Sequence, residues 1–90
     1  GVTFVLHAPA AQQVELVGSF NAWRPGEILL DGPDATGRWQ VTVPLPQGRH
    51  EYLFLVDGEQ WRTDPGAAFH RPDGFGSHNA VIDVNDEDPG

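Results

Sequence analysis

The sequence predicts an all-β domain, and three observations lead to this prediction. Glycine and proline make up 19 of the 90 residues (11 plus 8), which is unfavourable for long helices. No stretch shows the 3.6-residue spacing of apolar side chains that an amphipathic helix requires. Short runs of alternating apolar and polar residues instead recur between turn-forming residues, which is the pattern of half-buried strands. Ninety residues is the length of one domain.

Four strand-like runs are found in the first half of the chain, at residues 2–7, 13–18, 28–30 and 38–43. Each is followed by residues that favour turns, such as proline, glycine, serine and aspartate. The last run has the clearest alternation, because Trp39, Val41 and Val43 share one face of the strand. We therefore expect the ring of Trp39 to lie in the core.

A hairpin is predicted in the second half, where strands at residues 51–56 and 60–63 flank Asp57-Gly58. An Asp-Gly pair is one of the strongest signals for a tight turn between paired strands. Residues 51–56 are apolar on both faces of the strand. The face expected to point into the core carries three large residues, Tyr52, Phe54 and Val56.

A long loop is predicted between this hairpin and a last strand at residues 80–84. Asp64-Pro65-Gly66 ends the hairpin. About fifteen residues without a strand pattern follow, a length that is uncommon unless the loop is functional. The total of about seven strands is typical of an immunoglobulin-like β-sandwich, which is the predicted architecture. Because the chain has no cysteine, it lacks the Cys…Trp…Cys spacing of antibody domains.

Charge and composition exclude several kinds of function. Five arginines, no lysine and 13 acidic residues give a net charge of −8, which repels the phosphates of nucleic acids. No apolar run approaches the roughly 20 residues of a membrane-spanning helix. His70, Asp73 and Ser77 lie in one predicted loop, but their spacing alone does not make a catalytic triad, so we expect no enzymatic activity. The sequence predicts no cofactor and no metal site, since cysteine is absent and the acidic run at residues 83–88 lacks the glycine and final glutamate of a calcium loop.

The two ends of the sequence favour a domain taken from a longer protein. The chain begins at Gly1, with no methionine, and enters a strand-like run at once. Residues 85–90 are acidic and end in Pro-Gly, which is typical of a linker. We therefore expect a β-sandwich at residues 1–84 and an acidic linker or tail at residues 85–90.

A signature in the first half resembles a known family. Gly18-Ser19-Phe20-Asn21-Ala22-Trp23 resembles the G-x-F-N-x-W motif of carbohydrate-binding module family 48. That family includes the glycogen-binding domain of the AMP-activated kinase β subunit and the N-terminal domains of isoamylases and branching enzymes. Four further segments follow in the family's order: Pro46-Gln47-Gly48, residues 52–58, residues 61–65 and residues 76–81. The resemblance implies an immunoglobulin-like sandwich of the early-set type that binds α-1,4-linked glucans such as glycogen, starch or maltooligosaccharides.

The resemblance also implies a set of sugar-binding residues. Trp23 and Trp61 match the two tryptophans on which sugar rings stack, and stacking is favourable because one face of glucose is a patch of C–H groups. Asn79 matches an asparagine whose amide bonds to glucose hydroxyls, and Ser77 lies in the same loop. Phe75 matches an apolar side chain that enters the ring of a helical glucan. For Trp23, capping of the open end of the sandwich is the alternative role.

Leu53 departs from the family's pattern. The glycogen-binding members carry a lysine there, which donates hydrogen bonds to sugar hydroxyls. Leu53 and Leu55 are instead expected to form an apolar stripe on the outer face, and such stripes usually mark an interface. Two hypotheses stay open. The stripe belongs to a sugar platform with Trp23 and Trp61, or it seats an adjacent domain and the chain is a structural domain without sugar binding.

Overall fold

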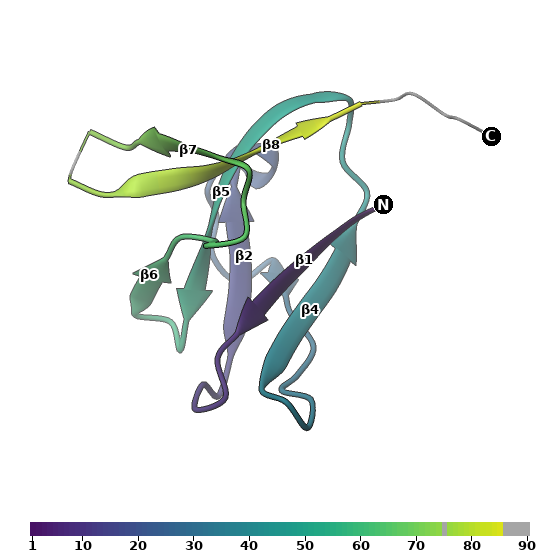
Figure 1. The fold of residues 1–90 in the computed structure, drawn as a ribbon, viewed down its shortest axis with the longest axis vertical. Coiled ribbons are helices and arrows are strands. Elements are labelled where there is room, and N and C mark those ends of the chain that lie inside the picture. Colours follow the sequence, from purple (N-terminus) through teal and green to yellow (C-terminus); the bar gives the residue numbers. More distant parts are fainter. Residues whose placement is uncertain (75, 86–90) are drawn as a thin grey trace.

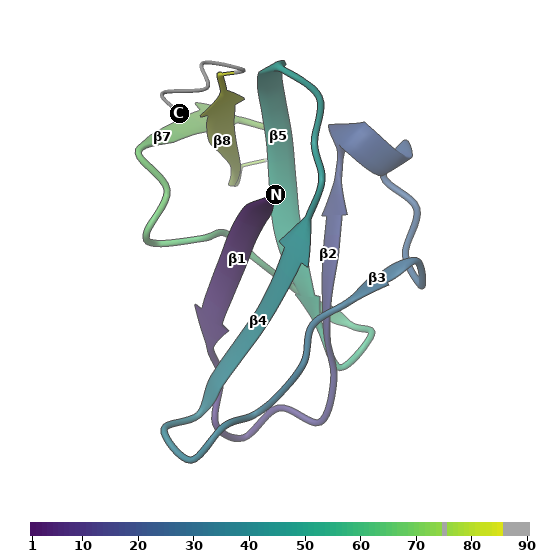
Figure 2. The ribbon, with the colours of Figure 1, turned by 90° about the vertical axis from the view of Figure 1, so that its right-hand side faces the viewer.

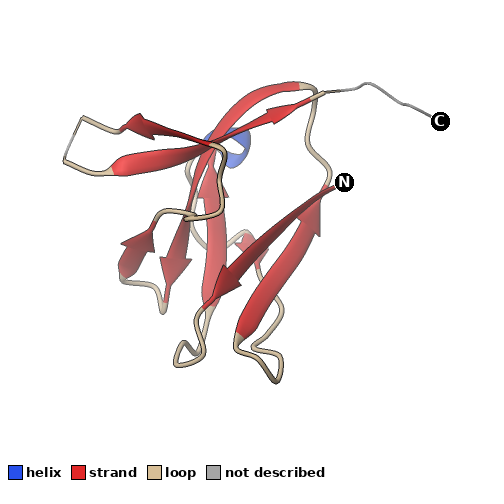
Figure 3. Ribbon diagram, in the orientation of Figure 1, coloured by secondary structure: helices blue, strands red, loops and turns tan. Residues whose placement is uncertain are grey.

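The computed structural model describes residues 1–74 and 76–85, and in this part of the chain it confirms the all-β prediction (Figures 1 and 3). The elements in chain order are β1 (Val2–His7), β2 (Val14–Gly18), the 3-10 helix η1 (Ser19–Asn21), β3 (Ile28–Leu29), β4 (Arg38–Val43), β5 (Gly48–Val56), β6 (Gln60–Arg62), β7 (Phe69–Pro72) and β8 (His78–Val84). Phe75 and most of the expected acidic tail, residues 86–90, lie outside the described residues. No helix within the described ranges is long and apolar enough to cross a membrane.

The strands form two antiparallel sheets that pack as an immunoglobulin-like sandwich. β1 and β4 form the smaller sheet, whose two strands lie beside each other in Figure 2. The larger sheet has the order β3-β2-β5-β8-β7, and β6 also pairs with β5. β5 is the central strand: β2 pairs with Tyr52 to Val56 on one edge, while β8 and β6 share the other edge.

The core lies between the sheets and contains the residues predicted from the alternating pattern. Trp39 is 4% exposed, and its indole Nε1 donates a 2.9 Å hydrogen bond to the carbonyl oxygen of Ala8. Tyr52, Phe54 and Val56 are buried on the inner face of β5, as predicted. The ring of Tyr52 meets that of Phe4 edge-on at a centroid distance of 4.8 Å. Aromatic packing therefore joins the two sheets.

β7 corrects the prediction of a long loop. This strand lies inside the expected loop and pairs with β8, from Phe69 opposite Val81 to Pro72 opposite His78. All four of its residues are exposed, so no alternation of apolar side chains marks it in the sequence. Its terminal proline is tolerated because β7 is the edge strand of the sheet. Only residues 73–77 separate it from β8.

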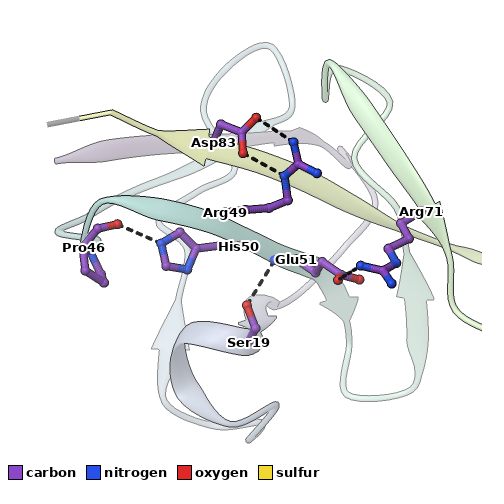
Figure 4. Close-up of polar contacts among 7 residues, drawn as sticks. All are labelled: Ser19, Pro46, Arg49, His50, Glu51, Arg71 and Asp83. Atoms are coloured by element: carbon purple, nitrogen blue, oxygen red, sulfur yellow. Dashed lines mark hydrogen bonds and ion pairs between the residues drawn. The ribbon is translucent and has the colours of Figure 1, made fainter. Parts of the chain in front are cut away.

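β5 begins at Gly48, which corrects the predicted start at residue 51, and polar contacts extend it (Figure 4). Arg49 donates two hydrogen bonds to Asp83 of β8, at 2.9 and 3.2 Å, and the pairing lowers the pKa of that carboxyl group. The backbone N–H of Glu51 donates to the hydroxyl oxygen of Ser19 (3.1 Å). The polar residues at the start of β5 belong to the strand because they pair with β8, and an alternating apolar pattern does not reveal this.

The loop before β4 makes the stability of the domain depend on pH. The pKa of Asp34 is lowered from 3.8 to about 2, first because the Thr36 hydroxyl donates to its carboxylate (2.7 Å), then because the N–H groups of Arg38 and Thr36 donate to it. The resulting stabilisation is present above about pH 4 and is lost as the pH falls through the folded-state pKa near 2. We expect Asp34→Asn to be less stable than the wild type at pH 5, with a difference that shrinks between pH 4 and pH 2.

Urea melts at four pH values measure this difference. The control is Asp31→Asn, because the Asp31 side chain accepts no hydrogen bond within the described part of the chain. A stability difference between the wild type and Asp34→Asn that is the same at pH 5 and pH 2 would contradict the prediction.

Candidate functional site

One hollow on the outer face of the larger sheet collects residues that are far apart in the sequence. Its volume is about 580 Å³, and its lining residues are Trp23, Leu53, Trp61, Asp73, Ser77 and Asn79. Five of the six predicted site residues are in this set. The sixth, Phe75, lies outside the described residues. The hollow is open, and it is bordered by the loop after η1, by β5 and β6, and by the turn between β7 and β8 with the start of β8.

The hairpin between β5 and β6 positions Trp61. Asp57 and Gly58 both have left-handed backbone conformations, with φ of 55° and 72°, as the predicted tight turn requires. β6 then pairs with β5 so that Trp61 lies opposite Leu55. The Trp61 side chain is 50% exposed, which agrees with its predicted place on the outer surface.

The predicted apolar stripe is only half present. Leu53 is half-buried and lines the hollow. Leu55 is only 4% exposed, because it lies between Glu15 of β2 and Trp61 of β6 in the sheet register. The expectation that Leu55 forms part of an exposed stripe was therefore wrong. Strand alternation places a side chain on a face, but the neighbouring strands decide whether that face is covered.

The loop after η1 presents Trp23 through an unusual backbone. Ala22 and Trp23 both have φ of 58°, a conformation that is uncommon and costly for residues with a side chain. The N–H of Trp23 donates to the carbonyl oxygen of Gly18 (2.9 Å), which closes this turn. The Trp23 side chain is 38% exposed and lines the hollow.

Two polar side chains hold this loop, and the sequence analysis assigned no role to either. Asn21 accepts a hydrogen bond from the N–H of Gly18 (3.1 Å) and donates through Nδ2 to the carbonyl oxygen of Arg24 (3.0 Å). Glu15 is 5% exposed, and its carboxylate accepts the N–H of Gly26 (3.0 Å). Asn21 belongs to the Gly-x-Phe-Asn-x-Trp signature, so the motif itself was the available signal. No signal in the sequence indicated the role of the Glu15 carboxylate, because the pattern of β2 indicates only a strand.

Removal of the Asn21 side chain should loosen Trp23. We expect Asn21→Ala to lower the free energy of unfolding by about 1 to 2 kcal/mol, because two hydrogen bonds of about 1 kcal/mol each are lost. Heteronuclear NOE values of the indole N–H groups should fall for Trp23 and stay unchanged for Trp39, which serves as the internal control. Equal values for Trp23 in both proteins would show that Asn21 does not fix the loop.

The turn between β7 and β8 supplies the polar part of the hollow. Asp73 accepts the N–H of Ser77 through Oδ1 (3.2 Å), and its own N–H donates to the carbonyl oxygen of Ser77 (3.0 Å). Asn79 donates through Nδ2 to Glu51 (3.2 Å). Glu51 in turn is 3.5 Å from Arg71, as Figure 4 shows for these two side chains. The amide oxygen of Asn79 accepts no hydrogen bond from the described residues, so it is available to a ligand.

This arrangement is suited to binding a neutral, hydroxyl-rich molecule. Two exposed indoles offer flat apolar surfaces, while Asp73, Ser77 and Asn79 offer short polar groups beside them. Within residues 1–74 and 76–85 there is no group of three His, Asp or Glu side chains placed to hold a metal ion.

A small β-sandwich with two exposed tryptophans and polar side chains around one hollow is typical of a carbohydrate-binding module. The sequence profile described as "Glycogen recognition site of AMP-activated protein kinase" matches residues 2–90, and the chain belongs to this family. The profile covers every element of the sandwich, from β1 to β8. The family resemblance noted for the signature at residues 18–23 is thereby confirmed.

Three similar curated proteins are all 1,4-alpha-glucan branching enzymes. The 1,4-alpha-glucan branching enzyme GlgB of Marinobacter nauticus is 33% identical over 88 residues, which cover 91% of this chain and 13% of that enzyme. GlgB of Roseobacter denitrificans is 41% identical over 79 residues, covering 88% of this chain and 10% of the enzyme. GlgB of Deinococcus radiodurans is 38% identical over 73 residues, which cover 77% of this chain and 10% of that enzyme. The chain therefore spans only 10% to 13% of the length of these relatives.

Proposed function

We propose that the chain is a non-catalytic module that binds α-1,4-linked glucans, such as glycogen, starch or maltooligosaccharides, on behalf of a longer protein. The observation that carries this proposal is the meeting of Trp23, Trp61 and Asn79 in one hollow of about 580 Å³. The indoles stack on the C–H faces of glucose units, because burial of these faces removes apolar area from water. Ser77 and Asn79 bond to hydroxyl groups and set the orientation. Phe75 acts as an apolar wedge against the glucan.

Binding rather than cleavage is the proposed activity of this chain. The relatives are enzymes, but the match covers only 10% to 13% of their length. Hydrolysis of a glycosidic bond usually uses two carboxyl groups on either side of the bond. Asp73 is the single carboxyl group among the residues that line the hollow. Incubation of the chain with maltoheptaose should therefore release no new reducing ends.

Titration with maltoheptaose tests the proposal. The site is open, so the energy of its contacts exceeds the cost of association only modestly. We expect a Kd between about 10 μM and 1 mM, or roughly −7 to −4 kcal/mol. Chemical shifts of the Trp23 and Trp61 indole N–H groups should move, and that of Trp39 should not. If millimolar maltoheptaose gives neither heat nor chemical-shift changes, the proposed function is wrong.

An adjacent domain is the second candidate occupant of this face. The relatives are about eight to ten times longer than the matched region, so a module of this kind has neighbours in those proteins. The burial of Leu55 weakens this alternative, since Trp23, Leu53 and Trp61 are the apolar residues that remain at the hollow. A native gel that contains glycogen separates the two functions. Retarded migration supports sugar binding, and unchanged migration supports a structural domain.

Leu53 offers a test by gain of function. A lysine at this position would add a hydrogen-bond donor at the edge of the hollow, worth about 0.5 to 1.5 kcal/mol. We therefore expect Leu53→Lys to lower the Kd for maltoheptaose by about 2- to 12-fold in calorimetry. Leu53→Met is the matched control, because it keeps an apolar side chain of similar volume. Equal affinities of the two variants would show that position 53 does not contact the ligand.

A further inference from the structure

Glu51 lies next to the hollow and contacts one of the residues that line it, Asn79. In the register of β5 and β8, Glu51 is opposite Val81, so Asn79 is its diagonal neighbour on the same face of the sheet. The Nδ2 atom of Asn79 is 3.2 Å from Oε1 of Glu51. The Glu51 side chain is 27% exposed and Asn79 is half-buried, so the contact is partly shielded from water.

The chemistry of a carboxylate determines which end of the Asn79 amide faces Glu51. An ionised carboxyl group accepts hydrogen bonds and donates none, so the NH2 group of Asn79 points toward it and the amide oxygen points away. That oxygen accepts no hydrogen bond from the described residues. Asn79 therefore offers an oxygen acceptor to a ligand in the hollow, together with the second hydrogen of its NH2 group.

Glu51 is itself held from two sides (Figure 4). Its backbone N–H donates to the hydroxyl oxygen of Ser19 (3.1 Å), and its Oε2 atom is 3.5 Å from Nη1 of Arg71. Arg71 belongs to β7 and lies opposite Asn79 in the register. Because the Arg71 side chain is 68% exposed, its pair with Glu51 adds little to the stability of the domain. The pair instead occupies Oε2 and leaves Oε1 to Asn79.

We propose that Glu51 is a positioning residue of the glucan site: its carboxylate fixes the orientation of the Asn79 amide, so that the amide oxygen accepts a hydroxyl hydrogen of the glucan. This inference rests on the proposed function and adds a residue that acts on the ligand only through another. Without Glu51, the Asn79 amide is free to rotate, and a ligand must order it at a cost in entropy. An effect of Glu51 on affinity should therefore disappear when Asn79 is absent.

A double-mutant cycle with maltoheptaose tests this coupling. Glu51→Ala and Glu51→Gln are each made in the wild type and in Asn79→Ala, and calorimetry gives the Kd values. Glu51→Gln keeps the length of the side chain, but its amide can face Asn79 with either an oxygen or an NH2 group, so the preferred orientation is lost. Glu59→Ala is the control, since Glu59 lies in the exposed turn between β5 and β6 and does not line the hollow. Urea melts check that each variant folds.

We expect both Glu51 variants to raise the Kd about 3- to 5-fold and Asn79→Ala to raise it about tenfold, as the loss of one hydrogen bond allows. In the Asn79→Ala background, the same Glu51 changes should alter the Kd by less than about twofold. The side-chain N–H resonances of Asn79 should shift in Glu51→Ala, because one N–H loses its charged acceptor. Glu59→Ala should bind like the wild type.

Equal losses of affinity in the two backgrounds would mean that Glu51 supports the sheet and not Asn79. Wild-type affinity of Asn79→Ala, or of both Glu51 variants, would also overturn the inference, and in each of these cases the proposed function stands. If Glu51→Ala is unfolded, the cycle with Glu51→Gln decides. A wild type that does not bind maltoheptaose would overturn the proposed function and the inference with it.

Discussion

Replacement of Trp61 by alanine is expected to abolish detectable glucan binding and to leave the domain folded. The Trp61 side chain is 50% exposed and belongs to a three-residue strand at the hollow, so its removal should cost less than about 1.5 kcal/mol of stability. Binding should suffer far more, because one of the two proposed stacking rings would supply a large share of a weak total. A glycogen pull-down and a urea melt on the same sample measure the two effects.

Trp61→Phe is the matched variant for this prediction. It retains a flat ring at the same register position, opposite Leu55, and should bind maltoheptaose within about tenfold of the wild type, a difference of roughly 1.4 kcal/mol. Wild-type binding by Trp61→Ala would show that the Trp61 ring does not contact the glucan. Unfolding of Trp61→Ala would mean instead that its cover over Leu55 is essential to the sheet.

Replacement of Trp39 by alanine should have the opposite result. The Trp39 side chain is 4% exposed, and its loss should cost about 3 to 5 kcal/mol, as is usual for a large aromatic residue of a core. The carbonyl oxygen of Ala8 also loses its buried partner, which adds to the cost. Because a domain holds only about 5 to 15 kcal/mol in total, Trp39→Ala should be barely folded at 25 °C.

Urea melts check this prediction, with Trp39→Phe as the control. Phenylalanine fills most of the volume but cannot donate to Ala8, so its cost should be smaller than that of alanine. A normal melt of Trp39→Ala together with unfolding of Trp61→Ala would mean that the inner and outer faces of the sheets are assigned the wrong way round.

The strands with a buried face could be predicted because their patterns are local. The alternation of Trp39, Val41 and Val43, and that of Tyr52, Phe54 and Val56, fixes the inner faces of β4 and β5 without knowledge of their partners. The Asp57-Gly58 turn is local in the same sense, because it depends on the backbone preferences of two residues. Such features need no long-range information.

The features that the sequence did not reveal depend on pairing between distant segments. β7 is exposed at all four positions, and only its partner β8 makes it a strand. Leu55 is covered because β2 and β6 lie on either side of it. Asp73 reaches the hollow because β7 and β8 hold their connecting turn there. Spacing along the chain contains none of these three facts.

The central position of β5 has a consequence for how the domain acquires its activity. The hollow brings together Trp23 and Asn79, which are 56 positions apart (79 minus 23). One wall of the hollow is the loop that follows β2 and η1, and the other is β8; β5 lies between β2 and β8 in the sheet. Closure of such distant pairings carries a large entropy cost, and sandwiches built from them fold in roughly milliseconds to seconds. A chain still emerging from the ribosome lacks one wall until β8 has paired. Affinity for glucan is thus a property of the finished sandwich, and a saturating oligosaccharide present at 100 times its Kd would stabilise that state by about 2.7 kcal/mol.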